Sequence, residues 1–288
     1  MHKYLKLICF FLIMAIILIL LSPVISLFLP YSLRYHACQR LVFNAIVDKE
    51  TKGCKTDEEK VLALFNYVVD HEKAKGTPYK CKPLDSLIYG EAYCDFQART
   101  LNLLLGIAGI PSRYAMLLDK DGISPHTLNE VFLNSKWCVY DTTMNIIFMD
   151  QKGNKLSLAD LTFKPELIDE VGYKNLLALY QRIIPIVKEP RRSTPVLFQT
   201  HIFDYVMDAY FKTFKNSFLD LYQDYYLASI KGRYKEEDLF LFYKARQYHL
   251  AYRMEMAISC YKRILNKYPN SKHYEEAMSF LVSYSDLT

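Results

Sequence analysis

The longest run of hydrophobic positions lies at the N-terminus, from Leu7 to Leu29, and contains no charged residue. A helix rises about 1.5 Å per residue, so this run is long enough to cross the roughly 30 Å hydrocarbon core of a bilayer. Lys3 and Lys6 precede it, and such charges favour the cytoplasmic side of a membrane. We therefore expect residues 1–30 to form an uncleaved membrane anchor with a cytoplasmic N-terminus and the rest of the chain outside the cytoplasm. A cleaved signal peptide and a buried soluble helix are the alternatives.

Two amphipathic helices are predicted in the next part of the chain. Thr56 begins the first in a capping box with Glu59, and apolar residues then recur at helical spacing up to Val68. The stretch from Tyr79 to Tyr93 has no clear periodicity, so we predict a loop there. The second helix is predicted from Cys94 to Leu105.

Short runs of apolar and β-branched residues then predict strands. Arg113 to Leu118 forms one run, and Leu128 to Leu133 and Trp137 to Asp141 form two more. Asn134 to Lys136 separates the last two runs, and this spacing is typical of a hairpin. The rest of the chain is predicted to be helical, with a domain boundary in the loop from Lys188 to Thr194. Helices followed by strands indicate an α+β fold.

The C-terminal part carries a second helical pattern, between Phe240 and Tyr268. It resembles a tetratricopeptide helix pair in its small, aromatic and terminating residues, which are Ala245, Tyr248, Ala257, Tyr261 and Pro269. One repeat is too short to stand alone, so we expect it to pack on a helix from Tyr205 to Leu227. The resemblance implies a helical module over residues 191–288, which serves either as a structural cap or as a surface for a protein partner.

The composition is that of a folded protein. The chain is 51% hydrophobic, with 24 Tyr and 17 Phe but only 9 Gly, which excludes a disordered or collagen-like chain. The net charge of +5 is modest and no long Lys/Arg run occurs, so we expect no nucleic-acid partner. The sequence contains neither a CxxC nor an HExxH motif, so we predict no metal site and no cofactor.

Seven cysteines are present. Cys9 lies in the apolar N-terminal run, and Cys94 stands apart because it begins a predicted helix. The remaining five are an odd number for an exported chain. A bond between Cys54 and Cys81 is conceivable because both flank one predicted helix, but spacing does not establish the connectivity.

Cys94 lies where the predicted loop meets the second predicted helix. Unpaired backbone N–H groups and the positive end of the helix dipole stabilise a thiolate at such a position. The same N–H groups can receive the oxyanion of a tetrahedral intermediate. A lone cysteine is more often a buried structural residue, so its neighbours decide the interpretation.

His126 and Asp141 lie at the two ends of the predicted hairpin that strand pairing brings together. A carboxylate there can hold an imidazole in its working tautomer. Any hairpin brings its ends together, so a surface histidine and a strand-terminal aspartate are the structural alternative.

Several segments resemble the transglutaminase-like superfamily. The first is GEAYCDFQA, from Gly90 to Ala98, which is followed by GIPSR, from Gly109 to Arg113. The others are HTLNEV, from His126 to Val131, and WCVYDTT, from Trp137 to Thr143. The resemblance covers roughly Thr56 to Asn145.

The resemblance implies a papain-like α+β core, which we assign to residues 31–190, and a catalytic triad of Cys94, His126 and Asp141. Members of this superfamily transfer the acyl group of a peptide bond or glutamine carboxamide to water or to an amine. We find no sequence sign of a lid that excludes water, so we favour a peptidase or amidase acting on a protein or peptide over a crosslinking acyltransferase. The alternative is a non-catalytic, membrane-tethered scaffold that binds a protein partner through its C-terminal helices.

Five further residues in or next to these segments bear on the site. Leu128 stands where the superfamily usually has an aromatic residue, and three residues, rather than one or two, follow Gly90 before the cysteine. We expect Trp137 to pack under the hairpin. Glu130 is either a partner of the triad or a solvated strand residue. Tyr89 is the first tyrosine to test as a side-chain donor to the oxyanion.

Overall fold

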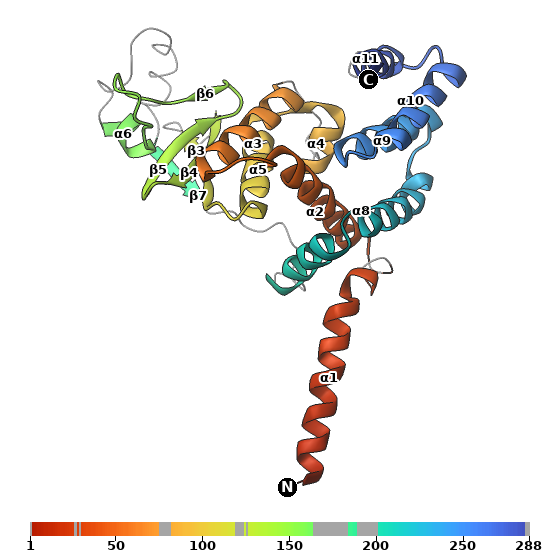
Figure 1. The fold of residues 1–288 in the computed structure, drawn as a ribbon. Helices are drawn as coiled ribbons and strands as arrows, with labels where there is room; N and C mark the ends of the chain where they lie inside the picture. The colour runs from red at the N-terminus through yellow and green to blue at the C-terminus, as the bar shows by residue number, and fades with distance from the viewer. Residues whose placement is uncertain are drawn as a thin grey trace. The chain divides into compact units, whose positions relative to one another are not determined.

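The computed structural model describes residues 2–25, 28, 30–74, 82–118, 124, 126–163, 184–188 and 201–285 (Figure 1). The chain divides into two compact units, one made of Met1–Ala45 with Arg192–Thr288 and the other of Ile46–Arg191. Residues 31–45, which we assigned from the sequence to the papain-like core, lie in the first unit. Cys94, His126 and Asp141 all lie in the second.

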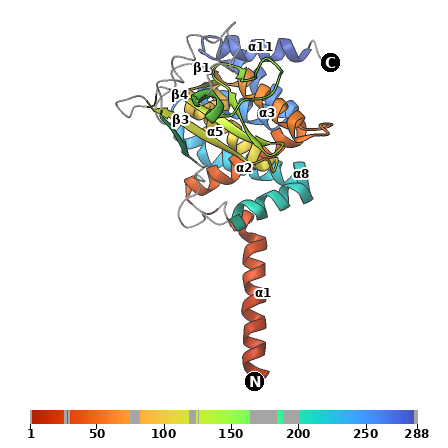
Figure 2. The same ribbon diagram turned by 90° about the vertical axis from the view of Figure 1, so that its left-hand side faces the viewer.

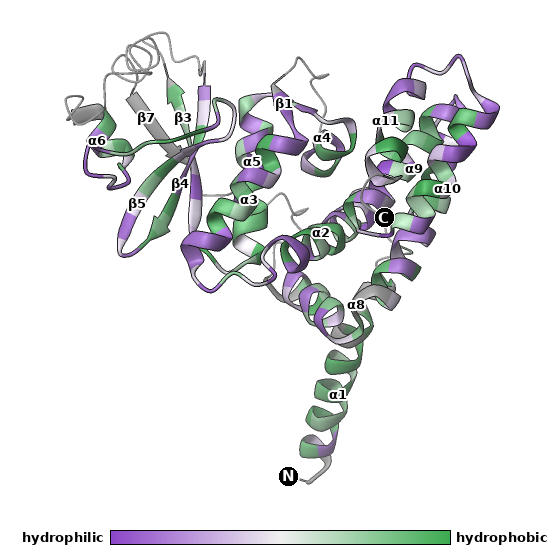
Figure 3. Ribbon diagram, turned by 45° about the horizontal axis from the view of Figure 1, so that its top comes forward, coloured by the Kyte–Doolittle hydropathy of each residue, from purple (hydrophilic) through white to green (hydrophobic). Residues whose placement is uncertain are grey.

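Helix α1 (His2–Ile25) forms from the N-terminal apolar run, and hydrophobic residues follow one another along it (Figure 3). No helix within the described residues is both long enough and apolar enough to cross a membrane. The predicted transmembrane helix is therefore not found in the described part of the chain.

Helix α2 (Tyr31–Glu50) is tied to α8 (His201–Ile230) by a partly buried ion pair. The Nε and Nη2 atoms of Arg40 donate to the two carboxylate oxygens of Asp208 at 2.7 and 2.6 Å. The Asn44 side chain donates to the same carboxylate at 2.8 Å. Such bidentate pairing is geometrically specific, so it fixes the first part of α2 to the C-terminal helices.

The C-terminal helices expected from the sequence are present. Helix α8 is followed by a short 3-10 turn, η4 (Lys231–Arg233), and then by α9 (Glu237–Leu250), α10 (Met254–Lys267) and α11 (Tyr274–Ser285). The small and aromatic residues of the repeat-like pattern are buried in α9 and α10, namely Ala245, Tyr248, Ala257 and Tyr261. Their assignment to a tetratricopeptide repeat stays a prediction.

After the end of α2, the second unit continues with α3 (Asp57–His71), α4 (Pro83–Tyr89) and α5 (Cys94–Ile107), which precede its sheet in the sequence. One bond of the predicted capping box of α3 is confirmed, since the Thr56 hydroxyl accepts the N–H of Glu59 at 3.2 Å. The Glu59 carboxylate accepts the N–H of Lys55 instead of that of Thr56. The bond to the Thr56 hydroxyl satisfies one of the backbone donors that a helix start leaves without a helical partner.

Helix α4 corrects the prediction of a loop from Tyr79 to Tyr93. Pro83 stands in its first turn, where a proline costs no hydrogen bond, and Gly90 ends it in the left-handed region with φ 68°. A helix of seven residues covers fewer than two turns, so it is too short to show a periodic pattern. Residues 79–81 of the predicted loop, Cys81 among them, lie outside the described residues.

The sheet is antiparallel, in the order β6-β5-β4-β3-β7. Its strands are β3 (Ser112–Leu118), β4 (His126–Leu133), β5 (Lys136–Asp141), β6 (Ile146–Ile147) and β7 (Ile184–Lys188). The prediction of an entirely helical C-terminal half is wrong at β7, which pairs with β3. Its sequence is rich in Ile and Val, and Pro185 is compatible with a strand at the edge of a sheet.

The predicted hairpin is confirmed by the pairing of β4 with β5. Asn134 and Ser135 form its turn, with φ of 51° and 63°. Positive φ at both central residues matches the right-handed twist of the flanking strands, and Asn tolerates it better than most residues. The turn thus sets the register that brings the far ends of the two strands together.

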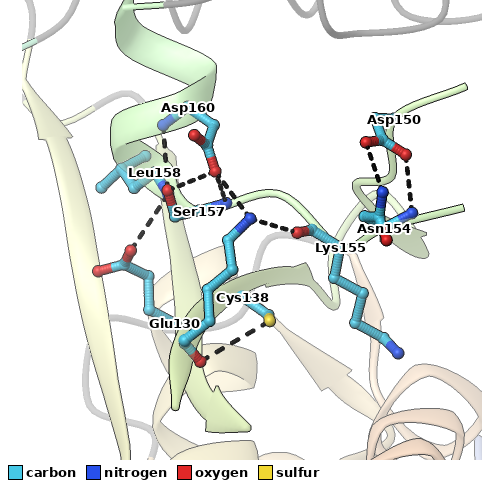
Figure 4. A network of polar contacts seen from close by, with 9 residues as sticks. Glu130, Cys138, Asp150, Asn154, Lys155, Ser157, Leu158 and Asp160 are labelled. Carbon is cyan, nitrogen blue, oxygen red and sulfur yellow. Dashed lines mark hydrogen bonds and ion pairs between the residues drawn. The ribbon is translucent and has the colours of Figure 1, made fainter. Parts of the chain in front are cut away.

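All residues of β4 except Phe132 are buried. The sheet lies between α6 and α5 in Figure 1, and Figure 2 shows β3 and β4 in front of α5. On one face the Asn129 side chain donates to the carbonyl of Ala98 in α5 at 2.8 Å. On the other face Glu130 accepts the N–H of Leu158, where α6 (Leu158–Phe163) begins (Figure 4). The apolar cluster of this second face consists of Ala115, Leu117, Leu128, Val139, Ile146, Phe148, Leu156, Leu158 and Leu161. The sheet therefore forms the middle layer between α5 and the α6 segment.

Candidate active site

The segment before Cys94 is held by a two-stranded parallel pair, β1 (Lys73–Ala74) with β2 (Glu91–Ala92). Gly90 leads into it with φ 68°, a conformation that side-chain-bearing residues rarely adopt. Tyr93 then serves as the extended N-cap of α5. The three residues between the glycine and the cysteine therefore have defined places, two in β2 and one at the cap.

Cys94 is the first residue of α5, and its side chain is half-buried. The Tyr93 side chain makes no capping hydrogen bond to the helix. The N–H groups of the first turn and the positive end of the helix dipole consequently lie beside the sulfur. Such a position favours a thiolate and provides donors for an oxyanion.

The hairpin brings His126 and Asp141 to the same end of the strand pair. Asn129 is paired with Tyr140, and beyond this pair β4 begins at His126 and β5 ends at Asp141. At this end the imidazole of His126 reaches the carboxylate of Asp141. Its Nε2–H donates to the Asp141 Oδ2 at 2.6 Å, and both side chains are buried, with relative exposures of 4% and 0%.

The second carboxylate oxygen of Asp141 is held by the loop that follows β5. Its Oδ1 accepts the backbone N–H groups of Thr143 and Met144 at 3.1 and 3.0 Å. Charge-assisted bonds of this kind are stronger than neutral ones, so they fix the orientation of the carboxylate. The aspartate is thus immobilised before it orients the imidazole.

The surroundings of His126 favour its charged form. Burial lowers the pKa of His126, but hydrogen bonds to the side chains of Asp141 and Cys94 and the charges of both groups outweigh burial and raise it to about 9. The imidazole therefore carries a proton at neutral pH. Because Nε2 is bonded to Asp141, Nδ1 is the nitrogen left for the sulfur of Cys94. An imidazolium beside a helix-start cysteine is the arrangement that activates thiol nucleophiles.

Three of the other residues singled out in the sequence have packing or hydrogen-bonding partners in the structure, and the role of the fourth stays a prediction. Glu130 is buried and accepts from Nε and Nη2 of Arg113 at 2.9 and 2.8 Å, so it is neither solvated nor bonded to the triad. Trp137 packs on the hairpin, with the Arg113 guanidinium 4.0 Å from its ring centre. Leu128 belongs to the apolar cluster described above. Tyr89 ends α4, and its role as an oxyanion donor stays a prediction.

Sequence reasoning did not select two buried polar residues that are linked to the segments carrying the triad. Gln97 is buried in the first turn of α5, and its side-chain oxygen accepts from the Thr143 hydroxyl at 2.7 Å. Glu72, directly after α3, is also buried. The only sequence signal for Gln97 is its spacing of three residues from Cys94, which places both in the same turn. Within the described residues, no group of three or more His, Cys, Asp or Glu is arranged to hold a metal ion.

Residues 44–142 match the family model of the transglutaminase-like superfamily. A comparison with curated proteins finds no match.

Two solved structures are similar to part of the chain. One is a candidate cysteine protease from Cytophaga hutchinsonii, with a TM-score of 0.33, 19% identity and coverage of 42% of each chain. The other is a candidate protease from Parabacteroides distasonis, with a TM-score of 0.31, 15% identity and coverage of 42% of this chain and 25% of that one. The chain thus spans less than half the length of these structures. Residues 44–142, which match the model of the transglutaminase-like superfamily, contain Cys94, His126 and Asp141.

Proposed function

We propose that the chain is a thiol enzyme that transfers the acyl group of a peptide bond or a glutamine carboxamide through Cys94, His126 and Asp141. One observation carries this proposal. A buried imidazole is bonded to a fixed carboxylate at 2.6 Å and also hydrogen-bonds the thiol at the start of α5. Nucleophile, base and orienting acid each have the partner that their role requires.

In the first half-reaction, the Cys94 sulfur adds to the carbonyl carbon and the carbonyl electron pair moves onto oxygen. The backbone N–H groups at the start of α5 stabilise this oxyanion. When the intermediate collapses, the C–N bond breaks and His126 gives its Nδ1 proton to the departing nitrogen. Ammonia or an amine leaves, and the acyl group remains on the sulfur as a thioester.

In the second half-reaction, His126 takes a proton from water as the oxygen adds to the thioester carbon. Collapse of this intermediate breaks the C–S bond, releases a carboxylic acid and restores the thiolate beside the imidazolium. An amine in place of water gives a new amide bond. We favour hydrolysis because water far outnumbers any amine unless the site excludes it.

The proposal is tested first with p-nitrophenyl acetate, whose acyl group reports an activated nucleophile without knowledge of the natural substrate. We expect a burst of p-nitrophenol and one acetyl group on the peptide that contains Cys94, found by mass spectrometry. The Cys94→Ala variant should lose both, whereas Cys54→Ala, which removes another partly exposed thiol, should keep them. Acetylation of other cysteines at equal rates, or none at all, would contradict the proposal.

The acyl acceptor and the substrate class are then tested together. Glutamine-bearing peptides and a peptide library are incubated with the protein, and ammonia release, peptide cleavage and incorporation of a fluorescent primary amine are measured. Ammonia release or cleavage without amine incorporation supports hydrolysis. Amine incorporation that exceeds hydrolysis would instead identify a crosslinking acyltransferase.

A further inference from the structure

Gln97 connects two different segments of the chain through the two ends of its side-chain amide. It follows Cys94 by three residues on α5 and is 1% exposed. Its Nε2 donates to the backbone carbonyl of Glu72, after α3, at 2.7 Å. Its Oε1 accepts the hydroxyl of Thr143, in the loop after β5, also at 2.7 Å.

The Thr143 end of this link leads directly to the candidate acid. The N–H groups of Thr143 and Met144 donate to Oδ1 of Asp141, and Oδ2 of Asp141 accepts from His126. The segment that Gln97 holds is therefore the one that orients the carboxylate. Hydrogen bonds made by Gln97, Thr143 and Asp141 therefore link α5 to the imidazole.

The Glu72 end of the link is fixed just as firmly. Besides the carbonyl that bonds Gln97, Glu72 uses its carboxyl Oε1 to accept the hydroxyls of Thr100 and Ser86 at 2.9 and 2.7 Å. Burial raises the pKa of Glu72 to about 8, although these two hydrogen bonds lower it. The carboxyl group is therefore uncharged at neutral pH and holds α5 without bringing a negative charge close to the site.

We propose that Gln97 is a positioning residue of the triad, whose amide sets the placement of the Asp141 loop relative to the helix that carries Cys94. The inference rests on the proposed function and assigns Gln97 no contact with substrate. A buried amide costs free energy when one of its partners is removed, so the geometry with both bonds made is strongly preferred. The loop, and with it the carboxylate, is held in the position from which it orients His126.

A purely structural role would give a different result from a positioning role. A glutamine that only satisfies buried backbone groups contributes to stability, and its loss lowers the unfolding midpoint. A glutamine that positions the Asp141 loop also controls the imidazolium beside the sulfur. The pH dependence of Cys94 reactivity distinguishes the two roles, because it depends on the imidazolium and not on overall stability.

The test uses Thr143→Val, which keeps the shape of the side chain and removes the hydroxyl that Gln97 accepts. We measure the rate of iodoacetamide modification of Cys94 between pH 5 and 9, together with thermal unfolding. At pH 6 we expect modification about tenfold slower than in the wild type, because a displaced imidazolium no longer activates the sulfur. Thr143→Ser, which restores the hydroxyl, should recover the wild-type profile.

A matched control makes the same chemical change away from the site. The Thr51 hydroxyl donates to the Val47 carbonyl at 2.7 Å, and Thr51→Val removes that bond. This variant should keep the wild-type pH profile. Gln97→Met, which removes both polar atoms at similar length, should reproduce the slow modification of Thr143→Val.

The outcomes separate this inference from the function on which it rests. In one outcome, Cys94 of the wild type is modified well below pH 8, and Thr143→Val has the same pH profile and only a lower unfolding midpoint. The positioning role is then wrong and the proposed function stands. If Cys94 of the wild type is modified only near the pH at which an ordinary thiol ionises, the result would contradict the proposed function, and the inference with it. Slow modification in Thr51→Val as well would also overturn the inference, because the effect would not be specific to the link.

Discussion

The carboxylate of Asp141 is fixed on both of its oxygens, by two backbone N–H groups on one and by His126 on the other. Asp141→Asn replaces an acceptor by an amide that can present a donor, which disfavours the tautomer with a proton on Nε2. We expect acylation by p-nitrophenyl acetate to slow by about 10²- to 10⁴-fold, while Cys94→Ala shows no acylation of the site. Wild-type rates in Asp141→Asn would mean that the aspartate does not orient the imidazole.

Sequence reasoning selected three residues whose side chains are hydrogen-bonded neighbours in the structure, because a hairpin and a helix start are local features. Cys94 begins a helix, and the turn at Asn134 sets the strands that carry His126 and Asp141. Gln97 was missed because its partners come from segments that are distant in the sequence. Nothing in a single sequence shows which backbone groups a buried amide will satisfy.

At the scale of elements, the approach to Cys94 depends on the conformation of Gly90 between α4 and β2. A Cβ at this position would lie 3.6 Å from the nearest atom, the His71 carbonyl oxygen, so space is sufficient and the φ of 68° is the obstacle. We expect Gly90→Ala to lower the free energy of unfolding by about 1–2 kcal/mol. Denaturant unfolding followed by fluorescence measures this directly, because the single Trp of the chain, Trp137, lies in the same unit.

Gly106 offers a matched control within α5. It is helical, and a Cβ there would have no atom within 4 Å. Gly106→Ala should leave stability unchanged or raise it by up to about 1 kcal/mol, because alanine is the better helix former. Equal losses in both variants would show that backbone conformation at Gly90 is not the cause.

The helix and the strand that sequence analysis missed are both too short to show a pattern of their own. Helix α4 has too few turns for a periodic pattern, although Pro83 at its start and Gly90 at its end are the usual boundary signals. Strand β7 is short and joins the sheet by pairing with β3, which is distant in the sequence. Helices α3 and α5 and the hairpin were predictable because each is marked by a local signal in the sequence: an N-cap residue, an apolar stripe at helical spacing or a turn sequence.

For the whole folded unit, Glu72 makes stability depend on pH. Its pKa is raised from 4.5 to about 8 by burial, so between these values the native state holds a proton that the unfolded state releases. The free energy of unfolding should therefore fall as pH rises, by about 1.4 kcal/mol per pH unit from this group. Glu72→Gln removes this contribution.

The cleanest window for this measurement is from pH 5 to 6.5. The raised pKa of His126 also stabilises the native state at low pH, but this contribution is lost only as pH rises through the interval from about 6.5 to 9. Below about pH 6.5, His126 is protonated in both the native and the unfolded state. Denaturant unfolding followed by Trp137 fluorescence should give a shallower slope for Glu72→Gln than for the wild type. Parallel slopes would show that Glu72 is ionised in the native state.

The most direct test of the triad is the rate at which iodoacetamide modifies Cys94 at pH 6.5, in the wild type and in His126→Ala. An imidazolium and a helix start beside the sulfur are the features that activate a thiol nucleophile, so we expect wild-type Cys94 to react at least tenfold faster than Cys54 in the same molecule. His126→Ala should bring the Cys94 rate close to that of Cys54. Cys94 that reacts only above about pH 8.5, as an ordinary thiol does, or reacts equally fast without His126, would contradict the account.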